Sequence, residues 1–187
     1  MNSTDPAWKI LAQRPIYENP WISVTEFDVL NPAKKPGLYG KVHFKNKAIG
    51  IIPIDEEGNT FLVGQSRFTL SNYSWEIPAG GGPLDLDTLE SAKRELQEET
   101  GLIAREWRLI LESHLSNSVT DEHGFIFLAT GLEAGSSEPE DTEDIQVRKL
   151  SLQEAYGMVR KGEITDSVSV MAILLVQMMM DKGEITL

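Results

Sequence analysis

The segment from Ala79 to Leu102, AGGGPLDLDTLESAKRELQEETGL, constrains the chain most, because it joins a glycine cluster to one clearly delimited helix. Asp87, followed three residues later by Glu90, is an Asp version of the helix capping box. Gly101 suits the left-handed conformation in which many helices end. An apolar stripe at helical spacing runs between these signals. The segment therefore predicts a helix that is anchored on one side to a core.

Three carboxylates share one face of this predicted helix. Glu95, Glu98 and Glu99 stand at positions i, i+3 and i+4, where side chains are neighbours and like charges repel one another. A divalent cation that prefers oxygen ligands removes this repulsion. Glu95 and Glu99 border the apolar stripe, and Arg94 is spaced to hold Glu98 and the earlier Glu90. We therefore expect a metal site, and the alternative is a solvent-exposed acidic face.

Composition limits the other possibilities. The 187 residues, 41% of them hydrophobic, suit one domain with at most a small appendage. A net charge of −12 argues against binding of long nucleic acids. Without cysteine, disulfides, thiolate metal sites and thiol nucleophiles are excluded. No signal peptide is evident, and the most apolar stretch, 168–180, is too short to cross a membrane. We expect a cytoplasmic protein.

The hydrophobic pattern gives a coarse order of elements. Residues 8–30 alternate as two strands around a turn at Asn19-Pro20, 31–40 are expected to form a loop, and 40–45 another strand. The apolar run 48–54 predicts a strand buried on both faces, and 60–64 is expected to return as its hairpin partner. Helices are expected over 152–161 and 166–182. These patterns suggest an N-terminal antiparallel strand region, 1–45, before a larger domain, 46–187.

The sequence RELQEETGL, with Gly80 fourteen residues before Arg94, resembles the Nudix box of the Nudix hydrolase family. One position departs from the family pattern, because Leu86 stands where a glutamate is expected. The segment WEIPAG at 75–80, the acidic loop EDTEDIQV and the later KGEITDSVSV resemble the branch of ADP-ribose pyrophosphatases and nucleoside diphosphate sugar hydrolases. The resemblance covers most of the chain and is weaker before residue 40.

This resemblance implies an α/β fold: a Nudix α/β/α sandwich with a mixed sheet and an added N-terminal antiparallel strand region. It implies a Mg²⁺-dependent pyrophosphatase, with Mn²⁺ as a possible substitute. Its substrate would be a nucleoside diphosphate sugar of the ADP-ribose or GDP-mannose type, and its products a nucleoside monophosphate and a sugar phosphate. In this branch residues 1–45 would mediate a homodimer and help to form the substrate pocket.

The resemblance also implies roles for individual residues. Glu95 and Glu99 would be the principal metal ligands, with the Ala79 carbonyl adding an oxygen. Glu98 would serve both as a ligand and in catalysis. The general base is expected in the acidic loop, as Glu140 or Glu143, and Glu143 is alternatively an additional metal ligand.

Four residues are candidates for contacts with the substrate. Arg67 follows a predicted strand and is suited to grip a phosphate, although a surface arginine would look the same. Glu76 is expected to orient Arg94 or a metal-bound water. Tyr17 and Trp21 are suited to stack on a nucleobase from the partner subunit; as buried aromatics of a dimer core they would look identical.

Two other functions fit the same residues. One is a Nudix hydrolase of another substrate class, such as dinucleoside polyphosphates, nucleoside triphosphates or capped RNA, of which the acidic composition makes long RNA least suitable. The other is a non-catalytic module that senses ADP-ribose. The substitution by Leu86 points toward the sensor, whereas the intact glutamates of the helix point toward an enzyme.

Overall fold

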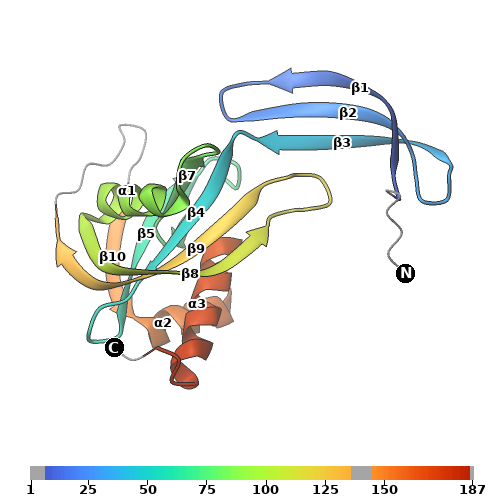
Figure 1. Ribbon diagram of the computed structural model, residues 1–187. Helices are drawn as coiled ribbons and strands as arrows, with labels where there is room; N and C mark the ends of the chain where they lie inside the picture. The colour runs from blue at the N-terminus through green and yellow to red at the C-terminus, as the bar shows by residue number, and fades with distance from the viewer. Residues whose placement is uncertain (1–6, 136–144, 186–187) are drawn as a thin grey trace. The chain divides into compact units, whose positions relative to one another are not determined.

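The computed structural model describes residues 7–135 and 145–185, and the chain divides into two compact units. The first unit comprises Met1–Lys47 together with His114–His123. The second unit comprises Ala48–Ser113 and Gly124–Leu187. Figure 1 labels the helices and strands of both units.

The first unit contains an antiparallel sheet of three strands in the order β1-β2-β3. The strands are β1 (Lys9–Glu18), β2 (Ile22–Leu30) and β3 (Pro36–Phe44). The Asn19 side chain closes the first turn, because its Oδ1 accepts hydrogen bonds from the amides of Trp21 and Ile22. The predicted N-terminal antiparallel strands are therefore confirmed.

The prediction of a loop over 31–40 is wrong in its second half. Strand β3 begins at Pro36, which pairs with Leu30 of β2. Proline lacks the amide donor that a central strand needs, but it is tolerated as the first residue of an edge strand. Pro36 occupies such a position, and so the proline and glycines that suggested a loop lie within a strand.

The hairpin tip at residues 114–123 joins this first unit, which the sequence pattern did not predict. Val42 of β3 donates from its amide to Val119 O at 2.9 Å and accepts at its carbonyl from the amide of Asp121 at 3.2 Å. The Asp121 carboxylate lies 3.0 Å from Lys41 Nζ and 2.8 Å from His43 Nδ1. Burial would raise the pKa of Asp121, but these contacts outweigh it and hold the pKa below its ordinary value.

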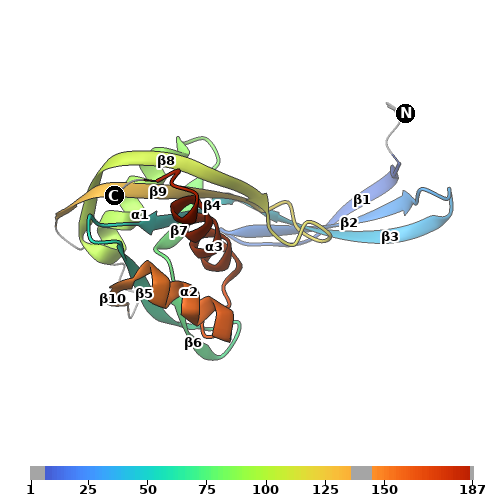
Figure 2. The same cartoon turned by 90° about the horizontal axis from the view of Figure 1, so that it is seen from below.

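In the residues that the structure describes, the second unit contains two sheets and three helices (Figures 1 and 2). A mixed sheet has the order β7-β4-β9-β8, in which β4 and β9 run parallel, and a second, antiparallel sheet has the order β10-β5-β6. The bounds of the mixed sheet are β4 (Asn46–Pro53), β7 (Ala79–Pro83), β8 (Leu102–His114) and β9 (His123–Ala134). Those of the antiparallel sheet are β5 (Asn59–Arg67), β6 (Asn72–Glu76) and β10 (Gln146–Ser151).

The helices are α1 (Thr88–Thr100), α2 (Leu152–Lys161) and α3 (Ser167–Asp181), which match the three predicted segments. In the part of the chain that the structure describes, none of them combines the length and the apolar character needed to cross a membrane.

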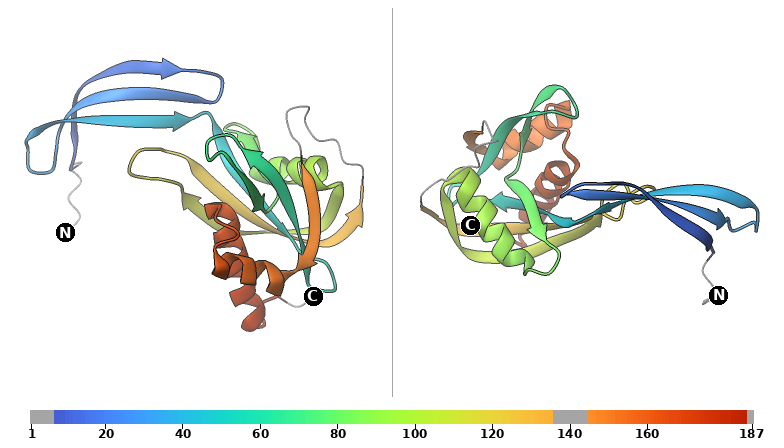
Figure 3. Two further views of the ribbon diagram at one scale, coloured as in Figure 1. Left: turned by 180° about the vertical axis from the view of Figure 1, so that it is seen from behind. Right: turned by 90° about the horizontal axis from the view of Figure 1, so that it is seen from above.

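Alternation along β4 places helices on both faces of the mixed sheet. Ile49 and Ile51 pack with Ala92 and Leu96 of α1 in one buried cluster. On the opposite face, a Cβ built on Gly50 would lie 2.5 Å from Val168 of α3, so β4 and α3 are in close contact there. Figure 3 shows the two helices on either side of the sheet. The predicted α/β/α sandwich and the doubly buried strand are confirmed.

The predicted hairpin of β4 and β5 is wrong beyond its turn. The two segments are joined by an isolated antiparallel bridge between Ile54 and Thr60, and β5 then pairs with β6 and β10 in the second sheet. The reason is that β7 and β9 already occupy both edges of β4. The Asp55 carboxylate braces the turn by accepting from the Asn59 amide and from Lys149 Nζ, each at 2.8 Å.

Candidate functional site

Helix α1 begins and ends where the sequence predicts. Asp87 Oδ1 accepts a hydrogen bond from the amide of Leu89 at 2.7 Å, and Gly101 adopts a left-handed conformation with φ of 69°. Glu90 of the predicted capping box instead pairs with Lys93 at 2.7 Å. Because Leu96 is fully buried against the sheet, the face of α1 that carries the glutamates has a fixed orientation.

Two of the three glutamates lie buried against the start of β7. Glu95 is 8% exposed and Glu99 is 3% exposed. The amide of Ala79 donates to Glu99 Oε2 at 2.9 Å, and the backbone of Gly80 lies directly against the Glu95 carboxylate. The structure therefore brings Ala79, Glu95 and Glu99 together, with the Ala79 amide rather than its carbonyl making the hydrogen bond to Glu99.

Arg94 compensates much of the negative charge in this cluster. It donates to Glu98 Oε2 at 2.5 Å, to Glu95 Oε1 at 2.6 Å and to the Gly81 carbonyl at 3.0 Å. Burial opposes the charged guanidinium, but Glu95 and Glu98 outweigh that effect and raise the pKa of Arg94. Arg94 thus links α1 to the glycine strand and holds Glu98, as expected, whereas Glu90 has Lys93 as its partner.

The chemistry of this cluster fits a hard divalent cation. Buried carboxylates of like charge are costly unless a counter-charge accompanies them, and oxygen ligands of this kind are those that Mg²⁺ binds. Among residues 7–135 and 145–185, no three His, Asp or Glu side chains already converge as a metal-binding group. The assignment of Glu95, Glu98, Glu99 and the Ala79 carbonyl as ligands stays a prediction.

Replacing Gly80 by alanine is expected to disturb Glu95 selectively. The new Cβ would lie 2.1 Å from the carboxylate of Glu95, so that this side chain must move. Because the obstructing atoms end a flexible side chain, the fold can adjust, but a metal ligand would be displaced. We expect Gly80→Ala to lower metal-dependent activity about 10- to 100-fold with little loss of thermal stability. Mn²⁺ titration and thermal unfolding would measure both effects.

Gly157→Ala provides the matched control for this substitution. Gly157 lies within α2, and a Cβ added there meets no atom within 4 Å. Alanine favours the helix over glycine by about 1 kcal/mol, so the control is expected to be slightly more stable and unchanged in metal dependence. Equal metal dependence in Gly80→Ala and wild type would contradict the assignment of Glu95.

Arg67 and Glu76 form a bidentate ion pair that the sequence pattern did not predict. Arg67 Nε lies 2.9 Å from Glu76 Oε1, and Nη2 lies 2.5 Å from Oε2. Burial alone would raise the pKa of Glu76, but hydrogen bonds from Arg67 outweigh it and lower the pKa. The hydrogen bonds to Glu76 also raise the pKa of Arg67. Glu76 therefore orients Arg67, whereas Arg94 binds Glu95 and Glu98; a role of Glu76 toward a metal-bound water stays a prediction.

A hollow of about 460 Å³ adjoins Arg67 at the end of the β5–β6 hairpin. Phe68, which is 96% exposed, and Tyr73 stand at its wall. Sequence reasoning missed both aromatic residues, although their position beside the predicted phosphate-binding arginine was visible. The full lining is Ser66, Arg67, Phe68, Ser71, Asn72 and Tyr73.

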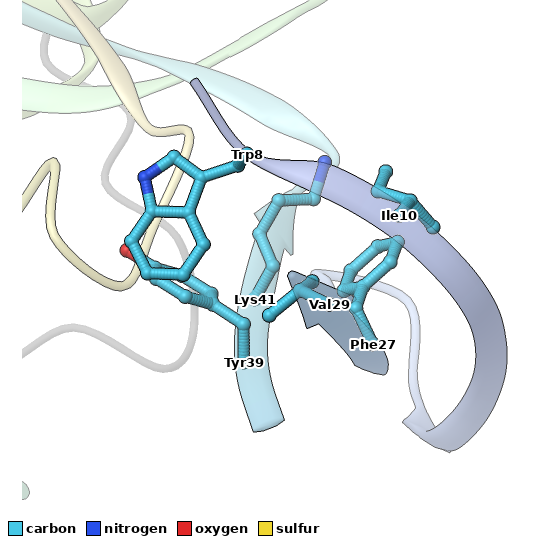
Figure 4. Close-up of a pocket in the computed structure, with 6 residues that line it drawn as sticks. All are labelled: Trp8, Ile10, Phe27, Val29, Tyr39 and Lys41. Carbon is cyan, nitrogen blue, oxygen red and sulfur yellow. The ribbon is translucent and has the colours of Figure 1, made fainter. Parts of the chain in front are cut away.

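Tyr17 and Trp21 belong to the first unit and are 55% and 66% exposed. They remain candidates for contact with a nucleobase. A separate hollow of about 300 Å³ lies on the sheet of this unit, where Trp8 and Tyr39 meet edge to face with ring centroids 5.4 Å apart (Figure 4). Its described lining is Trp8, Ile10, Phe27, Val29, Tyr39 and Lys41. The sequence pattern singles out neither aromatic: Trp8 lies at the start of the segment predicted as strand, and Tyr39 lies in the segment predicted as a loop.

The candidate general bases Glu140 and Glu143 lie outside the described residues. Their assignment stays a prediction, and with it the choice between a base and an additional metal ligand for Glu143.

The fold, the glycine strand and the carboxylates of α1 define the class of protein. The family model described as NUDIX domain matches residues 44–170. This match spans more than half of the chain, and so the chain belongs to the Nudix family.

The relatives define the branch. The ADP-ribose pyrophosphatase of Mycobacterium tuberculosis is 35% identical over 136 residues, which are 69% of this chain and 64% of that protein. The ADP-ribose pyrophosphatase of Bacillus subtilis is 29% identical over 172 residues, 91% of this chain and 92% of that protein. These matches confirm the predicted resemblance to Nudix hydrolases of the ADP-ribose pyrophosphatase branch.

A solved structure described as an ADP compounds hydrolase shares the fold. Its TM-score is 0.87 at 19% sequence identity, and the alignment covers 100% of both chains. This likeness confirms the α/β Nudix architecture.

Proposed function

We propose that the protein is a Mg²⁺-dependent pyrophosphatase that hydrolyses nucleoside diphosphate sugars, with ADP-ribose as the first substrate to test and GDP-mannose as the second. The observation that carries the proposal is the buried pair Glu95 and Glu99, held against Ala79 and Gly80. The names of the relatives support the choice of ADP-ribose.

A divalent cation bound by Glu95, Glu99 and the Ala79 carbonyl would lower the pKa of a water molecule and neutralise charge on the diphosphate. Mn²⁺ would substitute for Mg²⁺. Glu98, which Arg94 holds at the edge of the cluster, would add a further carboxylate for the cation and for catalysis. Arg67, oriented by Glu76, would donate hydrogen bonds to a phosphate oxygen in the fork geometry that suits phosphate.

The remaining parts of the site lie elsewhere in the chain. Glu140 or Glu143 would accept the proton of the attacking water. Tyr17 or Trp21 would stack on the nucleobase across a homodimer formed through residues 1–45. We further propose that the protein acts in the cytoplasm, on small nucleotides rather than on membranes or long nucleic acids.

The proposal is tested with purified protein, Mg²⁺ or Mn²⁺, and a panel of ADP-ribose, GDP-mannose, dinucleoside polyphosphates and nucleoside triphosphates. For the nucleotide sugars, whose diphosphate is protected at both ends, alkaline phosphatase releases phosphate only from the monophosphate products and so reports cleavage; for the triphosphates, which it attacks directly, the products are separated by chromatography instead. We expect the nucleotide sugars to be turned over fastest. Faster turnover of another class would identify a different Nudix hydrolase, whereas binding of ADP-ribose without turnover would identify a sensor.

A further inference from the structure

Ser169 is a fully buried polar residue of α3 that has no part in the reaction proposed above. Its Oγ donates a hydrogen bond to Asp166 Oδ2 at 2.7 Å. The same Oγ accepts a hydrogen bond from the amide of Ile77 at 2.9 Å. A hydroxyl has one proton, and the carboxylate takes it, which leaves a lone pair for the amide. The direction of both hydrogen bonds is therefore fixed.

The amide that Ser169 binds lies at the start of the segment that builds the candidate site. Glu76, immediately before Ile77, carries the ion pair to Arg67. Two residues after Ile77, the amide of Ala79 donates to Glu99. A displacement at Ile77 would therefore reach both the phosphate-binding arginine and the metal-binding carboxylate.

This segment is held from two sides. On one side the carbonyl of Pro78 accepts from the amide of Ile51 in β4 at 2.8 Å. On the other side Ser169 of α3 holds Ile77, across a sequence separation of 92 residues. Without the hydroxyl, the buried Ile77 amide would lose its partner and the segment would lose its hydrogen bond to α3, while the bond of Pro78 to β4 and the pairing of Glu76 with Val63 of β5 would remain.

The docking of α3 itself does not depend on this hydroxyl. Val168, Ala172, Ile173 and Val176 are all buried apolar residues of the same helix. Asp166 also accepts from the Ser169 amide at 2.8 Å and so caps the helix independently of the side-chain hydroxyl. The hydrogen bond from the Ile77 amide to Ser169 Oγ is therefore not needed to dock α3, and its main effect is to fix the position of the β6–β7 connection.

The charge of Asp166 also affects the pKa of Arg67. The pKa of Arg67 is raised chiefly by its hydrogen bonds to Glu76, and the negative charges of Asp166 and Glu99 raise it further. The carboxylate behind Ser169 therefore acts on the guanidinium that is expected to hold phosphate.

We propose that Ser169, supported by Asp166, is a positioning residue for the divalent cation and for Arg67. The proposal rests on the proposed function, because it assigns Glu99 and Arg67 to that reaction. Ser169 acts through the Ile77 amide, which fixes where Ala79 and Glu76 present their partners. It touches neither the substrate nor the cation.

The test compares Ser169→Ala and Asp166→Asn with wild type and with Ser151→Ala. Ser151 is the N-cap of α2 and accepts from the Glu154 amide at 3.1 Å, so its loss weakens a helix away from the carboxylates. Asparagine at 166 retains an oxygen that caps α3. Binding of Mn²⁺ is measured by electron paramagnetic resonance, folding by circular dichroism, and turnover of ADP-ribose by kcat and KM.

We expect Ser169→Ala to weaken Mn²⁺ binding about 10- to 100-fold, as is usual when a group that orients a metal ligand is removed. Asp166→Asn should fall between that variant and wild type. Ser151→Ala should lower the melting temperature and leave Mn²⁺ binding unchanged.

Mn²⁺ affinity within twofold of wild type in either folded variant would overturn the positioning role, as would an equal loss of affinity in Ser151→Ala. If Ser169→Ala does not fold, Asp166→Asn decides the question. Failure of wild type to hydrolyse any nucleotide sugar, together with weaker Mn²⁺ binding in Ser169→Ala, would reject the substrate assignment and support the positioning role.

Discussion

Glu99→Gln is expected to abolish most of the metal-dependent hydrolysis while leaving the fold intact. Glutamine keeps a side-chain oxygen that can accept from the Ala79 amide, now at 2.9 Å from Glu99, but it lacks the charge that binds the cation. Loss of several kcal/mol of transition-state stabilisation corresponds to a fall in kcat of about 1,000-fold. Steady-state kinetics with Mg²⁺, together with thermal unfolding without added metal, would measure the two effects separately.

Glu90→Gln is the control for this substitution on the same helix. Glu90 is largely exposed and pairs with Lys93, a surface contact that contributes little to stability. Its kinetics should match those of wild type. Full activity of Glu99→Gln at saturating Mg²⁺ would contradict the assignment of Glu99 as a metal ligand. An equal loss of activity in Glu99→Gln and Glu90→Gln would show that the net charge of the helix, and not a metal ligand, causes the effect.

The sequence was sufficient to predict the parts of the site that depend on local pattern. The capping residue Asp87, the terminal Gly101 and the spacing of Glu95 and Glu99 are all set within one helix, where periodicity of 3.6 residues determines which side chains share a face. The glycine cluster was visible in the sequence, but strand β7 was not predicted there; the structure shows that Gly80 permits close approach of the Glu95 carboxylate to the backbone.

The parts that could not be predicted depend on contacts between distant segments. The pairing of Arg67 with Glu76 requires knowledge of how β5 meets β6, and the contact between Ser169 and Ile77 joins residues 92 positions apart. The error in the β4–β5 hairpin has the same origin, because a strand pattern does not reveal which edges of a neighbouring strand are already occupied.

The contacts predicted from local pattern and the contacts between distant segments both involve the β6–β7 connection. Glu76 and Ala79, which flank this connection, hold Arg67 and Glu99 respectively, so the predicted phosphate-binding and metal-binding groups depend on one short stretch of backbone. A change in that backbone should therefore affect metal affinity and phosphate affinity together, whereas a change at Arg67 alone should affect mainly the substrate.

Arg67→Ala should show this separation and should also destabilise the fold. The Glu76 side chain is 6% exposed and Arg67 is 37% exposed, so the substitution leaves a buried carboxylate without its partner. Breaking a fully buried pair costs about 3–5 kcal/mol; because Arg67 is partly solvated, we expect roughly 2–3 kcal/mol. KM for ADP-ribose should rise at least about tenfold, since a bidentate charge-assisted contact to phosphate is lost, while Mn²⁺ affinity should change little.

The destabilisation should depend on pH in a defined direction. The folded pKa of Glu76 is lowered from 4.5 by Arg67, so the ion pair contributes its full stability above pH 4.5 and loses it as the pH falls through the folded pKa. In Arg67→Ala, burial without a counter-charge instead favours the protonated carboxyl. Urea unfolding of both proteins should therefore show a large difference at pH 7 that narrows toward pH 3.

Two comparisons make this prediction decisive. Arg105→Ala removes an exposed arginine that pairs with the exposed Glu133, and surface pairs of this kind contribute at most about 1 kcal/mol at any pH. The double substitution of Arg67 to alanine and Glu76 to glutamine removes both charges, so it should be more stable than Arg67→Ala at pH 7. If the double variant is instead the less stable protein, or if the deficit of Arg67→Ala is the same at pH 7 and pH 3, the ion pair does not control the stability of this connection. In that case the effect of Arg67 on stability would come from its packing against the other residues that line the hollow. The rise in KM would still measure its role in binding phosphate separately.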